Sequence, residues 1–392
     1  MDIIIVAHFC MDFSQTDNGR FSYLARMLSN NNDVEIITSD FFHTAKKYRE
    51  SLPELPYKVT LLHEPKYKKN ISLKRFFCHY IWGKNVEKYL SLRKKPDVIY
   101  CAVPSLSGPK RVAKYCNDNG IRFVIDIQDL WPEAFQMIFN IPFLFLPFSI
   151  MANTIYKKAD SICAVSETYV NRALKVNKKS DHGTTVFLGT DLALFDSYSR
   201  LPPIINKNSS EVWIAYCGTL GSSYDLTCVF DAMALLNYDK QRVSVIIMGD
   251  GPKKKEFEEY ANSRCINAVF TGRLPYNQMC SLLCRCDITV NPITHLAAQS
   301  IINKHADYAA SGLPVVSTQE NNEYRKLILE YQMGFNVENH NHVDLSDKLK
   351  MLIENEKMRK TMGQNARRCA EERFDRAQTY QLLLNVICEE KR

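Results

Sequence analysis

The sequence lacks the motifs that mark several large classes of nucleotide-binding and metal-dependent enzymes. Neither a Gly-x-Gly-x-x-Gly dinucleotide fingerprint nor a Walker Gly-x-x-x-x-Gly-Lys-[Ser/Thr] loop occurs, so dehydrogenase and P-loop functions lose their main support. An Asp-x-Asp motif is also missing, so a divalent metal ion is not implied. Internal repeats and low-complexity tracts are absent as well.

The thirteen cysteines are an odd number and are scattered without metal-site spacing. The tightest group, Cys280, Cys284 and Cys286, lies in an apolar helix-to-strand stretch, which favours buried structural thiols over a zinc site. We therefore predict no metal. Met1 leads straight into an apolar strand with no basic region or cleavage site, and with reduced thiols this predicts a cytoplasmic protein.

Short apolar runs rich in β-branched residues alternate with helical patterns, which is typical of buried parallel sheets. The first series of predicted strands comprises Ile3–Ala7, Val34–Thr38, Val98–Cys101, Phe123–Ile127 and Ser161–Val165. The second comprises Trp213–Cys217, Val243–Met248, Ala268–Thr271, Asp287–Val290 and Pro314–Ser317. Because 392 residues exceed the usual single core, we predict two doubly wound α/β domains facing a cleft.

Composition suggests where these domains divide. Between Leu201 and Ser210 the chain becomes rich in Pro, Asn, Ser and Lys, which is typical of a linker. We expect an N-terminal acceptor-binding domain at residues 1–203, a linker at 204–211, a C-terminal nucleotide-sugar domain at 212–375, and a C-terminal helix at 376–392 that packs back.

The stretch from Gln299 to Pro314 says most about function. Small polar residues open a predicted helix, with Lys304 in its first turn and Asp307 three residues later. A helix N-terminus with a lysine is an anion site, and a carboxylate one turn further can accept the hydroxyls of a ribose. This pattern indicates a nucleotide or nucleotide-linked ligand. The alternative is an amphipathic helix whose Lys304 and Asp307 face solvent.

Three other loops follow predicted strands and precede predicted helices, where α/β folds bind ligands. They are Asp17-Asn18-Gly19-Arg20, Cys217-Gly218-Thr219-Leu220-Gly221 and Gly249-Asp250-Gly251-Pro252. Their glycines permit close backbone approach to a ligand, although each loop could also be a plain turn.

These loops and the Gln299–Pro314 stretch resemble motifs of the retaining glycosyltransferases of family 4. Three further segments add to the resemblance: Ala159 to Glu167, the turn Leu188-Gly189-Thr190-Asp191, and Asp129-Leu130-Trp131-Pro132-Glu133. The resemblance covers nearly the whole chain and implies the two-domain GT-B fold. The Asp129 to Glu133 segment is similar to the branch that builds bacterial surface polysaccharides.

The resemblance implies a set of site residues. Lys304 and Asp129 are the catalytic candidates, the latter for orienting the acceptor, with helix capping as its alternative. Donor binding is expected from Gly218, Gly249, Gly251, Arg273, Gln299, Ser300, Asn303, Lys304 and Asp307. Acceptor binding is expected from Asn18, Gly19 and Asp129.

The chain departs from the family pattern at two places. Gln299 and Asp307 stand where members often carry glutamates eight positions apart, and Gly218-Thr219-Leu220 replaces Gly-Arg-Leu, with Arg273 as a partial substitute. The implied reaction is metal-independent hexosyl transfer without a cofactor, from a nucleotide-diphosphate sugar and with a UDP-sugar expected.

The acceptor side is basic and apolar. Residues 66–95 contain ten Lys/Arg and one acid, and Leu73, Phe76, Phe77, Tyr80 and Ile81 fall at helical spacing among them. This pattern indicates a helix that lies on anionic lipid, with a packed helix bearing solvated lysines as the alternative. No nucleic-acid-binding module accompanies the charge, so we expect no nucleic-acid partner.

The stretch from Ala134 to Tyr156 has no charged residue, but Pro142 and Pro147 argue against one spanning helix. It is either interfacial or buried. We therefore predict a glycosyltransferase on the inner face of the cell membrane, acting on a polyprenyl-diphosphate-linked glycan in capsule, O-antigen or exopolysaccharide synthesis. The alternatives are a non-catalytic sugar-nucleotide-binding scaffold and a GT-B-fold sugar-nucleotide 2-epimerase.

Overall fold

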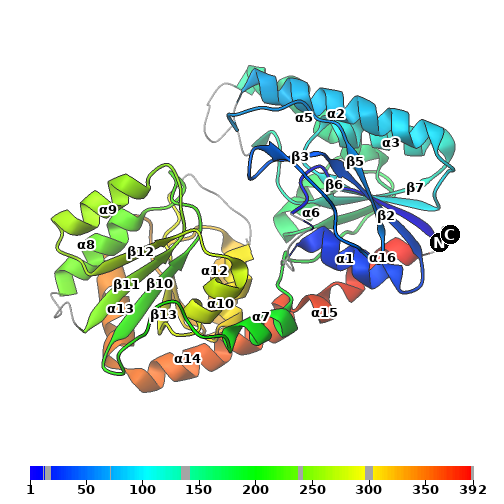
Figure 1. Cartoon of the computed structure of the whole chain (residues 1–392). Coiled ribbons are helices and arrows are strands. Elements are labelled where there is room, and N and C mark those ends of the chain that lie inside the picture. Colours follow the sequence, from blue (N-terminus) through cyan, green and yellow to red (C-terminus); the bar gives the residue numbers. More distant parts are fainter. Residues whose placement is uncertain are drawn as a thin grey trace. The chain divides into compact units, whose positions relative to one another are not determined.

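The computed structural model of the chain describes residues 1–11, 13, 19–70, 72–133, 142–236, 242–295 and 303–389. The chain forms two compact units (Figure 1). The N-terminal unit comprises Met1–Val186 and Tyr380–Arg392, and the C-terminal unit comprises Phe187–Thr379.

A seven-stranded parallel sheet forms the centre of the N-terminal unit (Figure 1). Its order is β5 (Lys58–Leu62), β2 (Asp33–Ser39), β1 (Asp2–Val6), β6 (Val98–Val103), β7 (Arg122–Ile127), β8 (Ser161–Ala164) and β9 (Thr184–Thr185). A small hairpin joins β3 (Phe41–Phe42) to β4 (Lys47–Tyr48). The helices are α1 (Arg20–Ser29), α2 (Leu73–Leu92), α3 (Ser107–Asn119), α5 (Pro142–Lys158), α6 (Glu167–Leu174) and α16 (Gln381–Cys388).

The C-terminal unit has a six-stranded parallel sheet. Its order is β12 (Ala268–Gly272), β11 (Val243–Met248), β10 (Val212–Cys217), β13 (Ile288–Asn291), β14 (Val315–Ser317) and β15 (Gly334–Asn336). The helices are α7 (Leu192–Ser199), α8 (Leu226–Leu236), α9 (Lys254–Ser263), α10 (Tyr276–Leu283), α11 (Asn303–Ala310), α12 (Asn322–Tyr331), α13 (His342–Glu354), α14 (Glu356–Cys369) and α15 (Arg376–Thr379), with a π-helical turn at Ala370–Phe374.

Both sheets confirm the predicted α/β class. In each, the first strand pairs with the second on one side and with a later strand on the other, which is the doubly wound order. The reversal lies between β1 and β6 in one unit and between β10 and β13 in the other. The carboxyl ends of these strand pairs are where such folds bind ligands.

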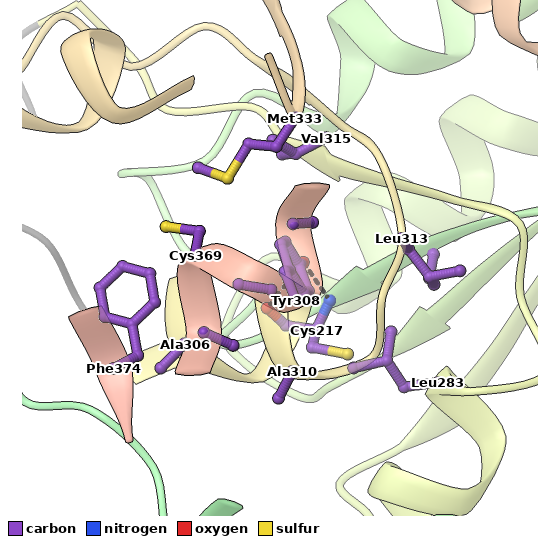
Figure 2. Packing of buried hydrophobic residues seen from close by; sticks show 14 of the residues in the cluster. Cys217, Leu283, Ala306, Tyr308, Ala310, Leu313, Val315, Met333, Cys369 and Phe374 are labelled. Carbon is purple, nitrogen blue, oxygen red and sulfur yellow. Dashed lines mark hydrogen bonds between the residues drawn. The ribbon is translucent and has the colours of Figure 1, made fainter. Parts of the chain in front are cut away.

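The core of the C-terminal unit holds α11 in place (Figure 2). Tyr308 is buried on this helix, and its hydroxyl accepts a hydrogen bond from the backbone N–H of Cys217 at 2.7 Å. Leu313 and Val315 belong to the same cluster. Since Cys217 ends β10, this packing fixes the helix that carries Lys304 at the reversal point of the sheet.

The division between the units differs from the expected one. Residues 187–203 were assigned to the N-terminal domain, but the C-terminal unit begins at Phe187. The reason is packing: Phe187, Leu192 and Phe195 are buried in one core with Trp213. The polar composition between 204 and 211 therefore reflects an exposed loop within the C-terminal unit.

The end of the chain returns to the N-terminal unit. Tyr380, Leu383 and Ile387 are buried in the core that contains β1. Arg122 of β7 donates a 2.9 Å hydrogen bond to the carbonyl oxygen of Ile387, near the end of α16. The returning segment thus begins at Tyr380, after the predicted position 376.

Helix α2 has a buried and an exposed side. Its N-cap, Ser72, accepts a hydrogen bond from the backbone N–H of Arg75 at 3.2 Å. Trp82 is fully buried against α3, where a Cβ at Gly108 would lie 2.4 Å from its ring. Across the described ranges, no helix is both long and apolar enough to cross a membrane.

Candidate functional site

Lys304 is a buried cation at the start of α11. It is 8% exposed, and its Nζ lies 4.1 Å from the ring centroid of Tyr224 and 4.8 Å from that of Tyr216. Among the residues that the structure describes, none forms a hydrogen bond with this Nζ. Burial lowers the pKa of Lys304 to about 7. The two aromatic faces stabilise the ammonium without neutralising it.

The neighbouring His305 anchors the same helix to two strand ends. Its Nε2 lies 3.1 Å from Nδ2 of Asn291, the last residue of β13, and its ring stacks on Tyr324 at 3.7 Å. Asn291 also donates to the hydroxyl of Ser317, which ends β14, at 2.9 Å. Burial lowers the pKa of His305, so its imidazole is neutral. Lys304 is therefore held at the carboxyl ends of the strands.

Asp307 is buried one turn further along α11. Its Oδ1 accepts hydrogen bonds from the hydroxyl of Tyr276 at 2.8 Å and from that of Thr190 at 3.2 Å. Burial raises the pKa of Asp307 to about 6, although both hydrogen bonds and Arg376 act in the opposite direction. The solvent-facing alternative for Lys304 and Asp307 is therefore wrong, because both side chains are buried.

Close packing between the loops that follow β10 and β11 requires glycine at several of their positions. A Cβ at Gly249 would lie 1.8 Å from the carbonyl oxygen of Gly218, and one at Gly251 would lie 2.3 Å from that of Leu220. Gly218 itself has φ +143°, which favours glycine. The backbone N–H of Leu220 donates to the carbonyl oxygen of Asp250 at 2.9 Å. The loops after β10 and β11 are thus joined beside the reversal point.

The other residues predicted to bind the donor do not all lie near the reversal point of the sheet. Arg273 is exposed just after β12, the edge strand, two strands away from β10. Asn303 begins α11. Gln299 and Ser300 lie outside the described residues. The structure therefore joins Gly218, Gly249, Gly251 and the Lys304 helix around the reversal point and leaves Arg273 at the sheet edge.

On the acceptor side, the predicted loop before α1 is only partly described. Asn18 lies outside the described residues, and Gly19 is the buried N-cap residue of α1. The adjacent Arg20 forms a buried ion pair with Asp126 of β7, with contacts of 2.9 and 3.1 Å. Arg20 therefore ties α1 to the sheet.

Asp129 lies two residues after β7. Its carboxylate accepts hydrogen bonds from the backbone N–H of Leu130 at 2.9 Å and from the indole Nε1 of Trp131 at 3.1 Å. Burial raises the pKa of Asp129. The carboxylate orients Trp131 and stabilises its own turn. Its predicted contact with an acceptor stays a prediction.

Sequence reasoning missed most of a buried polar cluster at the reversal point of the N-terminal sheet. In this cluster, Nδ1 of His8 lies 2.6 Å from the hydroxyl of Ser105, and its Nε2 lies 2.9 Å from Glu64. Arg75, grouped by sequence with the surface charges, is buried and donates to Nε2 of His79 at 3.3 Å. The spacing of Arg75 and His79, four residues apart on the face that bears Trp82, was the available signal.

The same cluster contains three groups of the kind that bind metals. The ligand-type atoms of His8, Glu64 and His79 lie within 4.8 Å of one another. The guanidinium beside His79 opposes a bound cation, and His8 already forms an ion pair with Glu64. We therefore assign these side chains to a polar network.

The C-terminal part of the chain is similar to a known protein family. Residues 198–369 match the family model described as glycosyl transferases group 1. An uncharacterized glycosyltransferase of Methanocaldococcus jannaschii is 20% identical over 236 residues, which are 56% of this chain and 56% of that protein. The alignment thus spans about half the length of this curated relative.

Solved structures match the whole chain in fold. Sucrose-phosphate synthase from Thermosynechococcus elongatus has a TM-score of 0.76 at 13% identity, covering 98% of this chain and 97% of that one. The Anabaena protein HepE in complex with UDP-glucose has a TM-score of 0.70 at 16% identity, covering 99% of both. A putative UDP-N-acetylglucosamine 2-epimerase from Listeria monocytogenes has a TM-score of 0.62 at 10% identity, covering 98% and 95%. The chain therefore has the GT-B fold, and residues 198–369 are similar to the glycosyl transferases group 1 family.

Proposed function

We propose that the chain is a retaining, metal-independent glycosyltransferase that moves a hexosyl group from a nucleotide-diphosphate sugar to a lipid-linked glycan. A UDP-sugar is the expected donor. The observation that carries the proposal is Lys304: an ammonium held over two tyrosine rings at the reversal point of the sheet. Burying such a charge is costly unless it is paired. A ligand diphosphate supplies the pairing.

Lys304 also suits the reaction itself. When the bond between the anomeric carbon and the β-phosphate oxygen breaks, negative charge develops on that oxygen. A preorganised ammonium in a buried site stabilises this charge more than it would in water. The acceptor hydroxyl forms the new glycosidic bond and passes its proton to the departing phosphate. This route leads to retention without a pair of protein carboxylates.

Asp307 supports a nucleoside contact in the same unit. Its pKa of about 6 leaves it mostly ionised at neutral pH, so it can accept hydrogen bonds from ribose hydroxyls. The hydroxyls of Tyr276 and Thr190 fix its orientation. The carboxylate is therefore preorganised, which lowers the entropy cost of ligand binding.

The N-terminal unit supports a membrane-bound acceptor. Leu73 and Phe77 of α2 are 89% and 59% exposed, and Phe143 of α5 is 88% exposed. Phe76 and Phe148 bring the two helices together, with ring centroids 4.9 Å apart. The nearby lysines at 68, 69 and 74 are exposed. Apolar side chains beside cations favour docking on the anionic inner face of the membrane, which fits capsule, O-antigen or exopolysaccharide synthesis on a polyprenyl-diphosphate carrier.

The test of the function is turnover of donor sugars. The purified chain is screened by thermal shift against UDP-, GDP-, ADP- and dTDP-sugars, since a ligand raises stability by mass action. The stabilising donor is then incubated without acceptor, and free nucleotide is measured. Release of nucleoside diphosphate with the sugar unchanged at C2 supports transfer. Inversion at C2 would support the epimerase, and binding without turnover would support the scaffold.

Lys304→Ala should lower kcat by roughly a hundredfold or more, because its charge acts chiefly in the transition state. Lys348→Ala is the matched control, since Lys348 pairs with Asp344 on the surface of α13. Both variants should melt close to the unchanged protein. A folded Lys304→Ala variant with unchanged kcat would remove the basis of the proposal.

A further inference from the structure

The N-terminal unit contains an apolar pocket outside the donor site. Its volume is about 190 Å³, and its lining residues are Phe76, His79, Tyr80, Leu106, Ser107, Trp131, Phe148 and Met151. These residues come from α2, α5, the segment that begins α3 and the turn after β7. An apolar cavity of about 150 Å³ holds one benzene molecule. This pocket therefore has room for a branched five-carbon unit.

The pocket is continuous with an exposed apolar surface. We define the α2–α5 apolar face by residues that are all substantially exposed: Leu73, Phe77, Tyr80, Phe143, Leu146 and Ile150. The spacing within each helix is three or four residues, so each set lies on one side of its helix. Tyr80 belongs both to this face and to the pocket wall. An apolar chain can thus extend from the face into the pocket.

Two cations lie close to the residues that line the pocket. The Arg75 guanidinium lies 5.0 Å from the ring centroid of Trp131, which lines the pocket, and bonds to His79, which also lines it. Arg75 also lies 5.9 Å from the ring centroid of Tyr67, and Nζ of Lys46 lies 4.7 Å from the same centroid. Tyr67 therefore places both positive charges in one cluster.

This cluster has more positive charge than negative. Burial lowers the pKa of Lys46 and of Arg75, and the charge of Arg75 lowers that of Lys46 further. Burial and the same two cations lower the pKa of His43 to about 4. The carboxylate that acts on the cluster, Glu64, is itself bonded to His8. An anion that binds here would satisfy charges that the protein leaves largely uncompensated.

We propose that this pocket binds the first isoprene unit of a prenyl diphosphate and that Arg75 and Lys46 bind its diphosphate. The choice of a lipid-linked acceptor rests on the proposed function. A prenyl diphosphate fits three features of the N-terminal unit. The two cations match its diphosphate, the aromatic pocket matches the branched unit next to the diphosphate, and the α2–α5 apolar face matches the rest of the prenyl group. A straight acyl chain lacks the branch that fills the pocket.

The test uses farnesyl diphosphate as a soluble probe, with no vesicle and no sugar nucleotide. Binding to the full chain is measured by calorimetry and by tryptophan fluorescence, since Trp131 lines the pocket. Farnesol, inorganic diphosphate and dodecyl diphosphate are the comparison probes. We expect farnesyl diphosphate to bind at least about tenfold more tightly than each of them.

Two pairs of variants separate the pocket from the cations. Met151→Trp fills the pocket, and Lys157→Trp places the same ring at an exposed position of α5 that belongs neither to the pocket nor to the α2–α5 apolar face. Lys46→Gln removes a cation of the cluster, and Lys47→Gln removes the neighbouring lysine, which pairs with Glu50. Met151→Trp and Lys46→Gln should each weaken binding about tenfold or more, whereas the two controls should stay within about twofold. If Met151→Trp folds poorly, Met151→Phe replaces it.

The outcomes distinguish this inference from the proposed function. If Met151→Trp binds farnesyl diphosphate as tightly as the unchanged protein does, the isoprene unit does not bind in the pocket. Equal binding of inorganic diphosphate would overturn the apolar contact, and equal binding of dodecyl diphosphate would overturn the choice of an isoprenoid. Sugar transfer to a soluble acceptor without prenyl diphosphate binding would refute the inference and leave the function intact. Prenyl diphosphate binding without any donor turnover would support the inference and contradict the proposed function.

Discussion

The buried ammonium of Lys304 makes donor binding depend on pH in a defined direction. Its pKa is about 7 in the free chain because burial disfavours the charged form, whereas an ordinary lysine titrates near 10.5. Both phosphates of a nucleotide-diphosphate sugar are esterified, so the ligand does not titrate in this range. Pairing with the diphosphate stabilises the ammonium. Binding above pH 7 must therefore take up a proton.

The size of the effect follows from this pKa. At pH 7 roughly half of the free protein carries the charge, and at pH 9 roughly one molecule in a hundred does. Donor affinity should therefore fall roughly 50-fold from pH 7 to pH 9, which is about 2.3 kcal/mol. Proton uptake should rise from about half a proton per ligand to about one over the same range.

Calorimetry in two buffers with different ionisation enthalpies measures both quantities. Lys304→Met should bind weakly and without proton uptake, whereas the surface control Lys348→Met should behave like the unchanged protein. Equal donor affinity at pH 7 and pH 9, with no proton uptake, would show that the lysine does not pair with the diphosphate.

Three further predictions concern the donor carboxylate, the membrane and the glycine loops. Asp307→Asn should weaken donor binding about tenfold. In the unchanged protein, the raised pKa of Asp307 lowers the free energy of unfolding by about 3 kcal/mol as pH rises from about 4 to about 6. Denaturant titrations of the Asp307→Asn variant should no longer show this pH-dependent loss. Unchanged donor affinity would refute the ribose role. Replacing Lys68, Lys69 and Lys74 by Glu should release the protein from anionic vesicles, as should high salt, because each cation contributes about 1 kcal/mol; vesicle binding that ignores both changes would contradict electrostatic docking. Gly249→Ala should lower the free energy of unfolding by about 2 kcal/mol or more, because its Cβ would lie 1.8 Å from a carbonyl oxygen, and a melting temperature like that of the unchanged protein would contradict this.

The central strands could be predicted from sequence because both of their faces are buried. Strands β1, β6 and β10 are buried along nearly their whole length, so they occur as continuous apolar runs. The edge strands β5 and β15 were not predicted. Their residues are mostly half-buried, and β15 has three residues, so neither gives a long apolar run.

The domain boundary could not be predicted from sequence. The amino-acid composition of a segment indicates whether it is exposed, but it does not indicate which core the neighbouring residues pack into. The Pro- and Asn-rich stretch before β10 indicates a loop, and the structure has one there. Which core receives the preceding helix depends on how Phe195 and Trp213 fit together, and both are buried in the C-terminal unit. No local pattern contains that information.

For the candidate site, the sequence located Lys304 and Asp307 on one helix but not their surroundings. The rings over Lys304 come from β10 and the loop that follows it, and the hydroxyls that hold Asp307 come from Thr190 and Tyr276. These residues are far from α11 in the sequence. The basic cluster around Arg75 escaped notice for the same reason, since its burial depends on contacts with Tyr67, His79 and the turn after β7.

The pKa shifts of Lys304 and Asp307 share one physical cause that links structure to function. Both groups move towards neutrality, one to about 7 and the other to about 6, because each is buried with too little compensation for its charge. A fold selected for stability alone would replace such groups, since uncompensated buried charge is costly. A diphosphate would neutralise the first, and ribose hydroxyls would solvate the second. The cost in the free protein therefore becomes binding free energy in the complex, and a donor sugar should raise the melting temperature by stabilising both groups together.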